Sequence, residues 1–97
     1  MSARVKICGV TTVEDARAAV DLGADLLGLN FYSGSPRFID AATARSLADA
    51  VRGRTRLVGV FVNSTIAEVE AIDAAVGLDL LQFHGDESAG FLAHFAA

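Results

Sequence analysis

Four apolar strand patterns alternate with helical patterns along the 97 residues. The strand patterns cover about residues 5–8, 26–31, 56–62 and 80–83, and a helical pattern follows each of them. Strand–helix units of about 20–30 residues in unbroken alternation indicate a parallel sheet whose strands are joined by right-handed crossovers. The sequence therefore predicts an α/β fold.

Residues that favour helix ends stand at the junctions. Thr11 with Glu14 has the spacing of a capping box, and Asp40 and Ser64 are the expected N-caps of the next two helices. The helices are expected to end at three glycines, which are Gly23, Gly53 and Gly77.

One segment is echoed later in the chain. Gly23-Ala24-Asp25-Leu26-Leu27 recurs as Gly77-Leu78-Asp79-Leu80-Leu81. The offset spans two strand–helix units, as expected for a fold built from repeated units of this kind.

Two closures fit the alternation, an open doubly wound sheet and a (βα) barrel. If Lys6 and Cys8 face inward, the matching rows on the other strands are Gly28 and Asn30, Gly59 and Phe61, and Gln82 and His84. Their neighbours on the outer side are apolar: Val5, Ile7, Leu27, Leu29, Val58, Val60, Leu81 and Phe83. Polar or small residues on one side and aliphatic residues on the other favour the barrel.

The number of strands is half of what a closed barrel needs. A (βα)8 barrel typically takes about 200–250 residues, and residues 93–97 contain no recognisable cap. We expect residues 1–97 to form a single partial domain, the N-terminal half of a (βα)8 barrel, as a fragment of a longer chain.

Composition narrows the functional class. The net charge is −4 and the eight basic residues are dispersed, which argues against a nucleic-acid or membrane partner but leaves a local anion site open. The single cysteine cannot form an intrachain disulfide, and no apolar run approaches about 18 residues. The lone cysteine and the lack of a long apolar run lead us to expect a cytoplasmic protein. We also expect no metal site, because the sequence contains no common metal-binding signature.

The first strand carries the strongest candidate for chemistry. Lys6 and Cys8, the only lysine and the only cysteine, lie two residues apart and so face the same side of a strand. An adjacent cation favours the thiolate form of a cysteine, which makes the pair a candidate site for proton transfer. The alternative is that Cys8 is a small buried hydrophobic residue and Lys6 a solvated charge.

Other polar residues are expected at the same rim of the sheet. Arg37 follows the second strand and could bind a carboxylate through two parallel hydrogen bonds, or it is a surface arginine. His84 ends the fourth strand and could act as a general acid or base, or it caps the following helix. Asn63 is expected to serve the turn into the third helix.

Four linked motifs resemble phosphoribosylanthranilate isomerase, a TIM-barrel enzyme of tryptophan biosynthesis. They are Lys6-Ile7-Cys8-Gly9-Val10-Thr11, Gly28-Leu29-Asn30-Phe31-Tyr32 with Ser35-Pro36-Arg37-Phe38, Val58-Gly59-Val60-Phe61-Val62-Asn63, and Gln82-Phe83-His84-Gly85-Asp86-Glu87. Their order and spacing follow the N-terminal half of the family.

The resemblance implies an Amadori rearrangement of an aminoaldose phosphate to an aminoketose phosphate, without a cofactor. It makes Cys8 the general base and places Arg37 near the anthranilate carboxylate, and we expect Lys6 and His84 to contact the phosphosugar substrate. The family's general acid, an aspartate, and its phosphate-binding loops belong to the second half of the barrel, so we expect these 97 residues alone to be inactive.

Two other readings remain. Open strand edges would favour self-association, and the chain could then be a non-catalytic, self-associating half-barrel that binds an anion. An enzyme of the indole-glycerol-phosphate synthase type is the other alternative, but the motifs around Cys8 and Arg37 argue against it.

Overall fold

The computed structural model describes residues 5–95, in which four strands alternate with four helices. The elements are β1 (Lys6–Cys8), α1 (Val13–Asp21), β2 (Leu26–Asn30), α2 (Ala41–Val51), β3 (Arg56–Phe61), α3 (Ile66–Val76), β4 (Leu80–Phe83) and α4 (Ala89–Phe95). The predicted α/β alternation is confirmed. No helix in this part of the chain is both long and apolar enough to cross a membrane.

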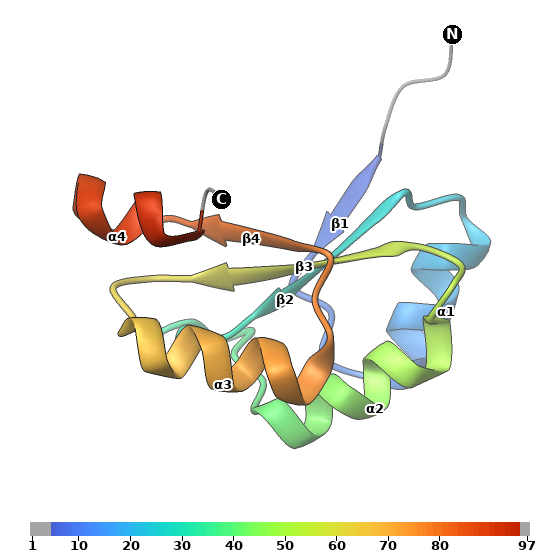
Figure 1. Ribbon diagram of the computed structural model, residues 1–97. Coiled ribbons are helices and arrows are strands. Elements are labelled where there is room, and N and C mark those ends of the chain that lie inside the picture. Colours follow the sequence, from blue (N-terminus) through green and yellow to red (C-terminus); the bar gives the residue numbers. More distant parts are fainter. Residues whose placement is uncertain (1–4, 96–97) are drawn as a thin grey trace, which may run out of the picture.

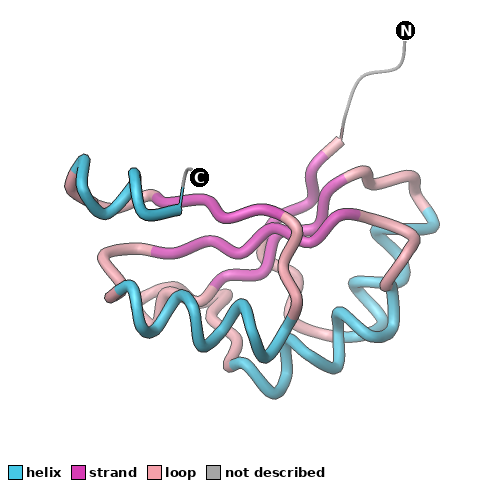
Figure 2. The backbone as a smooth tube through the Cα atoms, in the orientation of Figure 1, coloured by secondary structure: helices cyan, strands magenta, loops and turns pink. Residues whose placement is uncertain are grey.

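The strands form one parallel sheet in the order β1-β2-β3-β4. Helices α1, α2 and α3 lie side by side on one face of this sheet (Figure 1), and the backbone tube shows the same two layers (Figure 2). A doubly wound sheet reverses its strand order and has helices on both faces, whereas a (βα)8 barrel adds each strand next to the previous one with every helix outside. The fold is therefore four consecutive units of a barrel, as predicted.

The hydrophobic core lies between the sheet and the helices. Its strand residues include Leu27, Leu29, Leu57 and Phe61, and its helix residues include Ala16, Leu47, Val51 and Val69. Helix α4 joins this core through an aromatic cluster, because Phe83 contacts Phe91 and Phe95 at centroid distances of 5.1 and 5.4 Å.

The predicted orientation of β3 is wrong, whereas the register agrees with the inward rows expected for the other three strands. Val60 pairs with Asn30 on one side and with Gln82 on the other, so these three side chains share the inner face. Phe61 instead packs with the helical layer and stacks on Phe31 at a centroid distance of 5.3 Å. Both faces of β3 are buried, so the residues on both sides are apolar. The sequence of this strand therefore does not show which side faces inward.

Two of the three predicted helix caps lie one residue away from the expected position. Thr12, rather than Thr11, accepts a hydrogen bond from the backbone N–H of Asp15. Helix α3 begins after Thr65 instead of Ser64, where Thr65 and Glu68 form a reciprocal capping box. Both errors occur where two adjacent hydroxyl residues compete. Asp40 caps α2 as predicted.

The echoed segment has a structural counterpart at the amino ends of the strands. The Asp25 carboxylate accepts a hydrogen bond from the Val5 N–H at 2.8 Å, and the Asp25 N–H donates to the Val5 carbonyl at 2.9 Å. Asp79 makes the same two bonds with Leu57, at 2.7 and 2.9 Å. These pairs, here called the aspartate clasps, fix β1 against β2 and β3 against β4.

Candidate functional site

The candidate site lies on the inner face of the sheet, toward the carboxyl ends of the strands. Cys8 is the last residue of β1, and its side chain is exposed. The interpretation of Cys8 as a buried hydrophobic residue is therefore wrong. A solvent-accessible thiol at the carboxyl end of a barrel strand is placed where this fold carries its chemistry.

Because Gly28 has no side chain, it leaves room for the Cys8 thiol. It is the β2 partner of Cys8 in the sheet register. A Cβ atom added to Gly28 would lie 2.7 Å from the Cys8 Sγ and 3.1 Å from the Cys8 Cα. Any larger residue at this position would displace either the thiol or the strand that carries it.

The loop after β2 brings Arg37 to the same place. Ile39 anchors the end of this loop, since its N–H donates to the Asn30 carbonyl at 3.0 Å. The Ser35 hydroxyl accepts from the Arg37 N–H at 3.1 Å, which sets the backbone before the arginine. The Arg37 side chain then passes over Gly9, and a Cβ at Gly9 would collide with it. Arg37 therefore lies beside the residue that follows Cys8.

A polar chain crosses the inner face from β1 to β4. The Lys6 ammonium donates a hydrogen bond to Gln82 Oε1, and Gln82 Nε2 contacts His84 Nε2. The contact joins the two edge strands of the sheet, so the sheet must curve around this face. Lys6 and His84 were predicted site residues. Gln82 was expected beside His84 on the inward row, because a spacing of two places both on one face, but it was given no role of its own.

Asn63 and Glu87 hold the loop between β4 and α4. Glu87 accepts hydrogen bonds from the N–H groups of Asn63 and Gly85 at 2.7 and 2.9 Å, and Asn63 Oδ1 accepts from the Asp86 N–H. Desolvation raises the pKa of Glu87, but the hydrogen bonds from these N–H groups and attraction to His84 together lower it below its usual value. Asn63 thus supports two loops, not only the turn that was predicted.

His84 does not cap helix α4. The hydroxyl of Ser88 accepts the hydrogen bond from the Phe91 N–H at the start of α4. The alternative that His84 caps this helix is therefore wrong. Its ring instead contacts the inner-face amide of Gln82.

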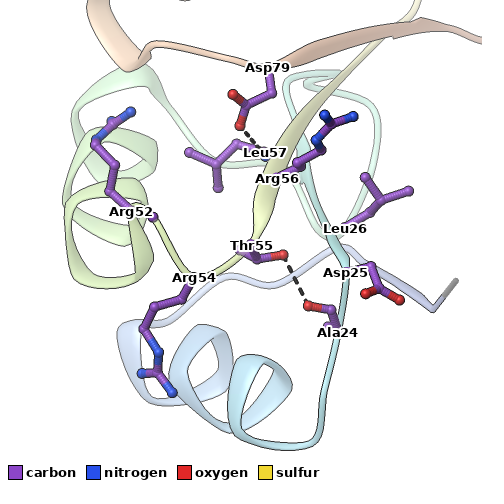
Figure 3. Close-up of a pocket in the computed structure, with 10 residues that line it drawn as sticks. Ala24, Asp25, Leu26, Arg52, Arg54, Thr55, Arg56, Leu57 and Asp79 are labelled. Atoms are coloured by element: carbon purple, nitrogen blue, oxygen red, sulfur yellow. Dashed lines mark hydrogen bonds between the residues drawn. The ribbon is translucent and has the colours of Figure 1, made fainter.

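A cavity lies at the other end of the sheet, around the aspartate clasps (Figure 3). It measures about 530 Å³. Its three arginines point in different directions. Arg52 donates to the Val76 carbonyl at the end of α3, and Arg54 pairs with Asp21 at 2.7 Å. These contacts join elements, so we interpret this end as structural.

The residues on the inner face are suited to proton transfer on a carboxylate-bearing substrate. In its thiolate form Cys8 can take up a proton, and the Arg37 guanidinium beside Gly9 can bind a carboxylate. Lys6 and His84 add polar groups to the same face. Within residues 5–95, no three His, Cys, Asp or Glu side chains are grouped closely enough to hold a metal ion.

Comparison with known proteins places this geometry in a family. The sequence profile described as N-(5'phosphoribosyl)anthranilate (PRA) isomerase matches residues 5–96. An N-(5'-phosphoribosyl)anthranilate isomerase from Acidithiobacillus ferrooxidans is 53% identical over 85 residues, which are 88% of this chain and 42% of that protein.

Solved structures of this enzyme have the same fold. Phosphoribosyl anthranilate isomerase from Thermotoga maritima superposes with a TM-score of 0.94 and 37% identity, covering 98% of this chain and 46% of that one. A phosphoribosyl anthranilate isomerase in complex with reduced 1-(o-carboxyphenylamino)-1-deoxyribulose 5-phosphate has the same TM-score and identity, and the match covers 98% of this chain and 49% of that one. The chain thus spans less than half the length of these relatives. It belongs to the N-(5'-phosphoribosyl)anthranilate isomerase family.

Proposed function

We propose that the chain forms the first four βα units of a phosphoribosylanthranilate isomerase, as one partial domain over residues 1–97. The reaction would be the Amadori rearrangement of N-(5'-phosphoribosyl)anthranilate, an aldose-to-ketose isomerisation in tryptophan biosynthesis. One observation carries the proposal: the exposed Cys8 thiol lies at the end of β1, and Arg37 lies over the adjacent Gly9.

We propose for the two residues the roles that membership of the family implies, and the chemistry of their side chains agrees with those roles. The Cys8 thiolate acts as the general base that removes the proton from C2 of the sugar. The Arg37 guanidinium binds the anthranilate carboxylate through parallel hydrogen bonds and holds the sugar over the thiol. The complex of a relative with a reduced carboxyphenylamino-deoxyribulose phosphate supports a substrate of this class.

Lys6 and His84 complete the substrate contacts on the inner face. Both are joined to Gln82, so their positions are coupled. The general acid and the phosphate-binding loops would come from the second half of the barrel. We therefore expect no measurable isomerase activity from these 97 residues alone, and for this biosynthetic role we propose the cytoplasm as the location.

A chimera tests the assignment. Residues 5–96 replace the matching segment of the Acidithiobacillus ferrooxidans relative, and isomerisation of phosphoribosylanthranilate is followed by product formation. The unmodified chimera should be active. Cys8→Ser should lower kcat by about 10²–10⁴-fold, as expected for loss of a general base.

Arginine variants separate substrate binding from a change of charge. Arg37→Gln should raise KM, whereas Arg17→Gln, on the exposed side of α1, should leave kcat and KM unchanged. A folded chimera that is inactive, or one that keeps full activity after Cys8→Ser, would contradict the proposal.

A non-catalytic, self-associating half-barrel is the second candidate. It is favoured because, among the described residues, β1 pairs only with β2 and β4 only with β3, so both outer edges are open. Sedimentation velocity distinguishes the two candidates. A stable dimer of the chain combined with an inactive chimera would support it, and a monomer at all concentrations would exclude it.

A further inference from the structure

Gln82 occupies a position where its amide can adopt only one orientation. Its side chain is half-buried between the ammonium of Lys6 on β1 and the imidazole of His84 beyond β4. A lysine ammonium has three N–H donors and no acceptor. The Gln82 oxygen must therefore face Lys6, and the Gln82 NH₂ group must face His84.

This orientation determines which nitrogen of His84 carries the proton. An amide NH₂ group is only a donor, so the ring nitrogen that it contacts must accept. That nitrogen is Nε2, and a neutral imidazole that accepts at Nε2 carries its proton at Nδ1. Through the amide, Lys6 thus sets the tautomer of a ring that it does not touch.

We propose that Gln82 is a positioning residue that holds His84 as the neutral Nδ1–H tautomer, so that His84 offers a hydrogen-bond donor to substrate oxygen and does not act as a base. The tautomer follows from the contacts of this chain alone. The role toward substrate deepens the proposed isomerase function and depends on it.

The contacts around His84 leave its Nδ1 side open. Glu87 interacts electrostatically with His84, but its oxygens accept from the N–H groups of Asn63 and Gly85, and among the described residues neither oxygen is hydrogen-bonded to the His84 ring. Lys6 reaches His84 only through Gln82. The Nδ1–H group therefore has no protein acceptor among the contacts of the described residues and is available to a ligand.

Nitrogen NMR of the chain tests the tautomer without any activity measurement. Long-range ¹H–¹⁵N correlations of the imidazoles are recorded at about pH 8.5, above the usual titration range of histidine. His94→Gln, remote from the inner face and paired with Glu70 in the native chain, assigns the His84 signals. We expect His84 to show a protonated Nδ1 and an unprotonated Nε2.

Two substitutions test the cause. Gln82→Glu replaces the NH₂ donor with a carboxylate oxygen, so the two His84 nitrogen shifts should exchange. Lys6→Met lets the amide rotate and should average the two shifts, and Lys6→Arg, which keeps a donor, should restore the native pattern. Lys6→Met keeps the test valid if Gln82→Glu does not fold.

The outcomes separate this inference from the proposed function. A native His84 protonated at Nε2, or a pattern unchanged in both Gln82→Glu and Lys6→Met, would overturn the tautomer assignment even if the chimera were active. In the active chimera, Gln82→Glu should raise KM about tenfold with little change in kcat, because one hydrogen bond to substrate is lost. A loss confined to kcat would instead make His84 a base and overturn its role as donor.

Discussion

The Arg37 side chain fills the space into which a side chain at Gly9 would extend. Gly9 also has a φ of +82°, in the left-handed region that favours glycine. Two independent requirements therefore select glycine directly after Cys8. One concerns the backbone and the other concerns the position of the guanidinium.

Substituting Gly9 should show both requirements. Gly9→Ala should lower the free energy of unfolding by more than about 1 kcal/mol, the usual scale for alanine at positive φ. Gly53→Ala is the matched control, because Gly53 has a φ of +85° but no atom within 4 Å of the added Cβ. Urea unfolding of the two variants separates strain from collision, and equal losses would show that Arg37 yields without penalty.

Gly28→Ala should act on the thiol. The added Cβ would lie 2.7 Å from Sγ, so the Cys8 side chain must rotate or β1 must shift. Because Cys8 is the only cysteine, its rate of reaction with a disulfide reagent reports directly on this change. We expect the rate to change several-fold. Gly90→Ala, where the added atom meets nothing within 4 Å, should leave it unchanged.

The aspartate clasp at Leu57 should contribute measurably to stability. Asp79→Ala leaves the half-buried Leu57 N–H without its acceptor, which typically costs about 1–3 kcal/mol. Asp25→Ala removes the equivalent bond at an exposed position and should cost less. Unfolding free energies and amide exchange at Leu57 test this order. The reverse order would contradict the structural role given to this end of the sheet.

Asp40 should make stability depend on pH in the acid range. Hydrogen bonds from the Thr43 backbone N–H and hydroxyl lower the pKa of Asp40 and outweigh desolvation, which would raise it. The unfolded chain therefore binds more protons in this window, so the stabilisation is complete above the ordinary value of about 3.9 and is lost as pH falls through the folded value.

Asp40→Asn keeps an N-cap oxygen but cannot titrate. Its free energy of unfolding, measured by urea titration between about pH 2.5 and 6, should therefore vary less with pH than that of the native chain. Parallel curves for the two proteins would show that Asp40 does not carry the effect.

The architecture could be predicted from the sequence because several independent features indicated the same fold. Strand patterns, caps and glycines all indicated the same alternation, and the polar row on β1, β2 and β4 indicated a barrel. Cys8 and His84 lie at the carboxyl rim as expected, and the loop after β2 brings Arg37 there, since residues that end parallel strands meet at one edge of the sheet. Lys6 instead begins β1 and pairs with Leu26, the first residue of β2, so the expectation that it ends the strand is wrong and only its side chain reaches Gln82.

The errors occurred where the sequence carried no distinguishing signal. Phe61 and Val60 are both apolar and both buried, so only the register shows which of them faces the helices. Gln82 was expected on the inward row but was given no role, because nothing about a neutral amide in the sequence indicates one. Its importance appears only when Lys6, from the other edge of the sheet, is folded against it.

The aspartate clasps also bear on how the chain folds. Each clasp joins residues only 20 or 22 positions apart, so each closes a short loop containing one helix. Loop closure becomes more costly as the logarithm of loop length, and parallel sheets are otherwise slow to assemble because their contacts are distant in sequence. Two strand–helix–strand nuclei, residues 5–30 and 56–83, can therefore form separately and early, with α2 bringing them together afterwards.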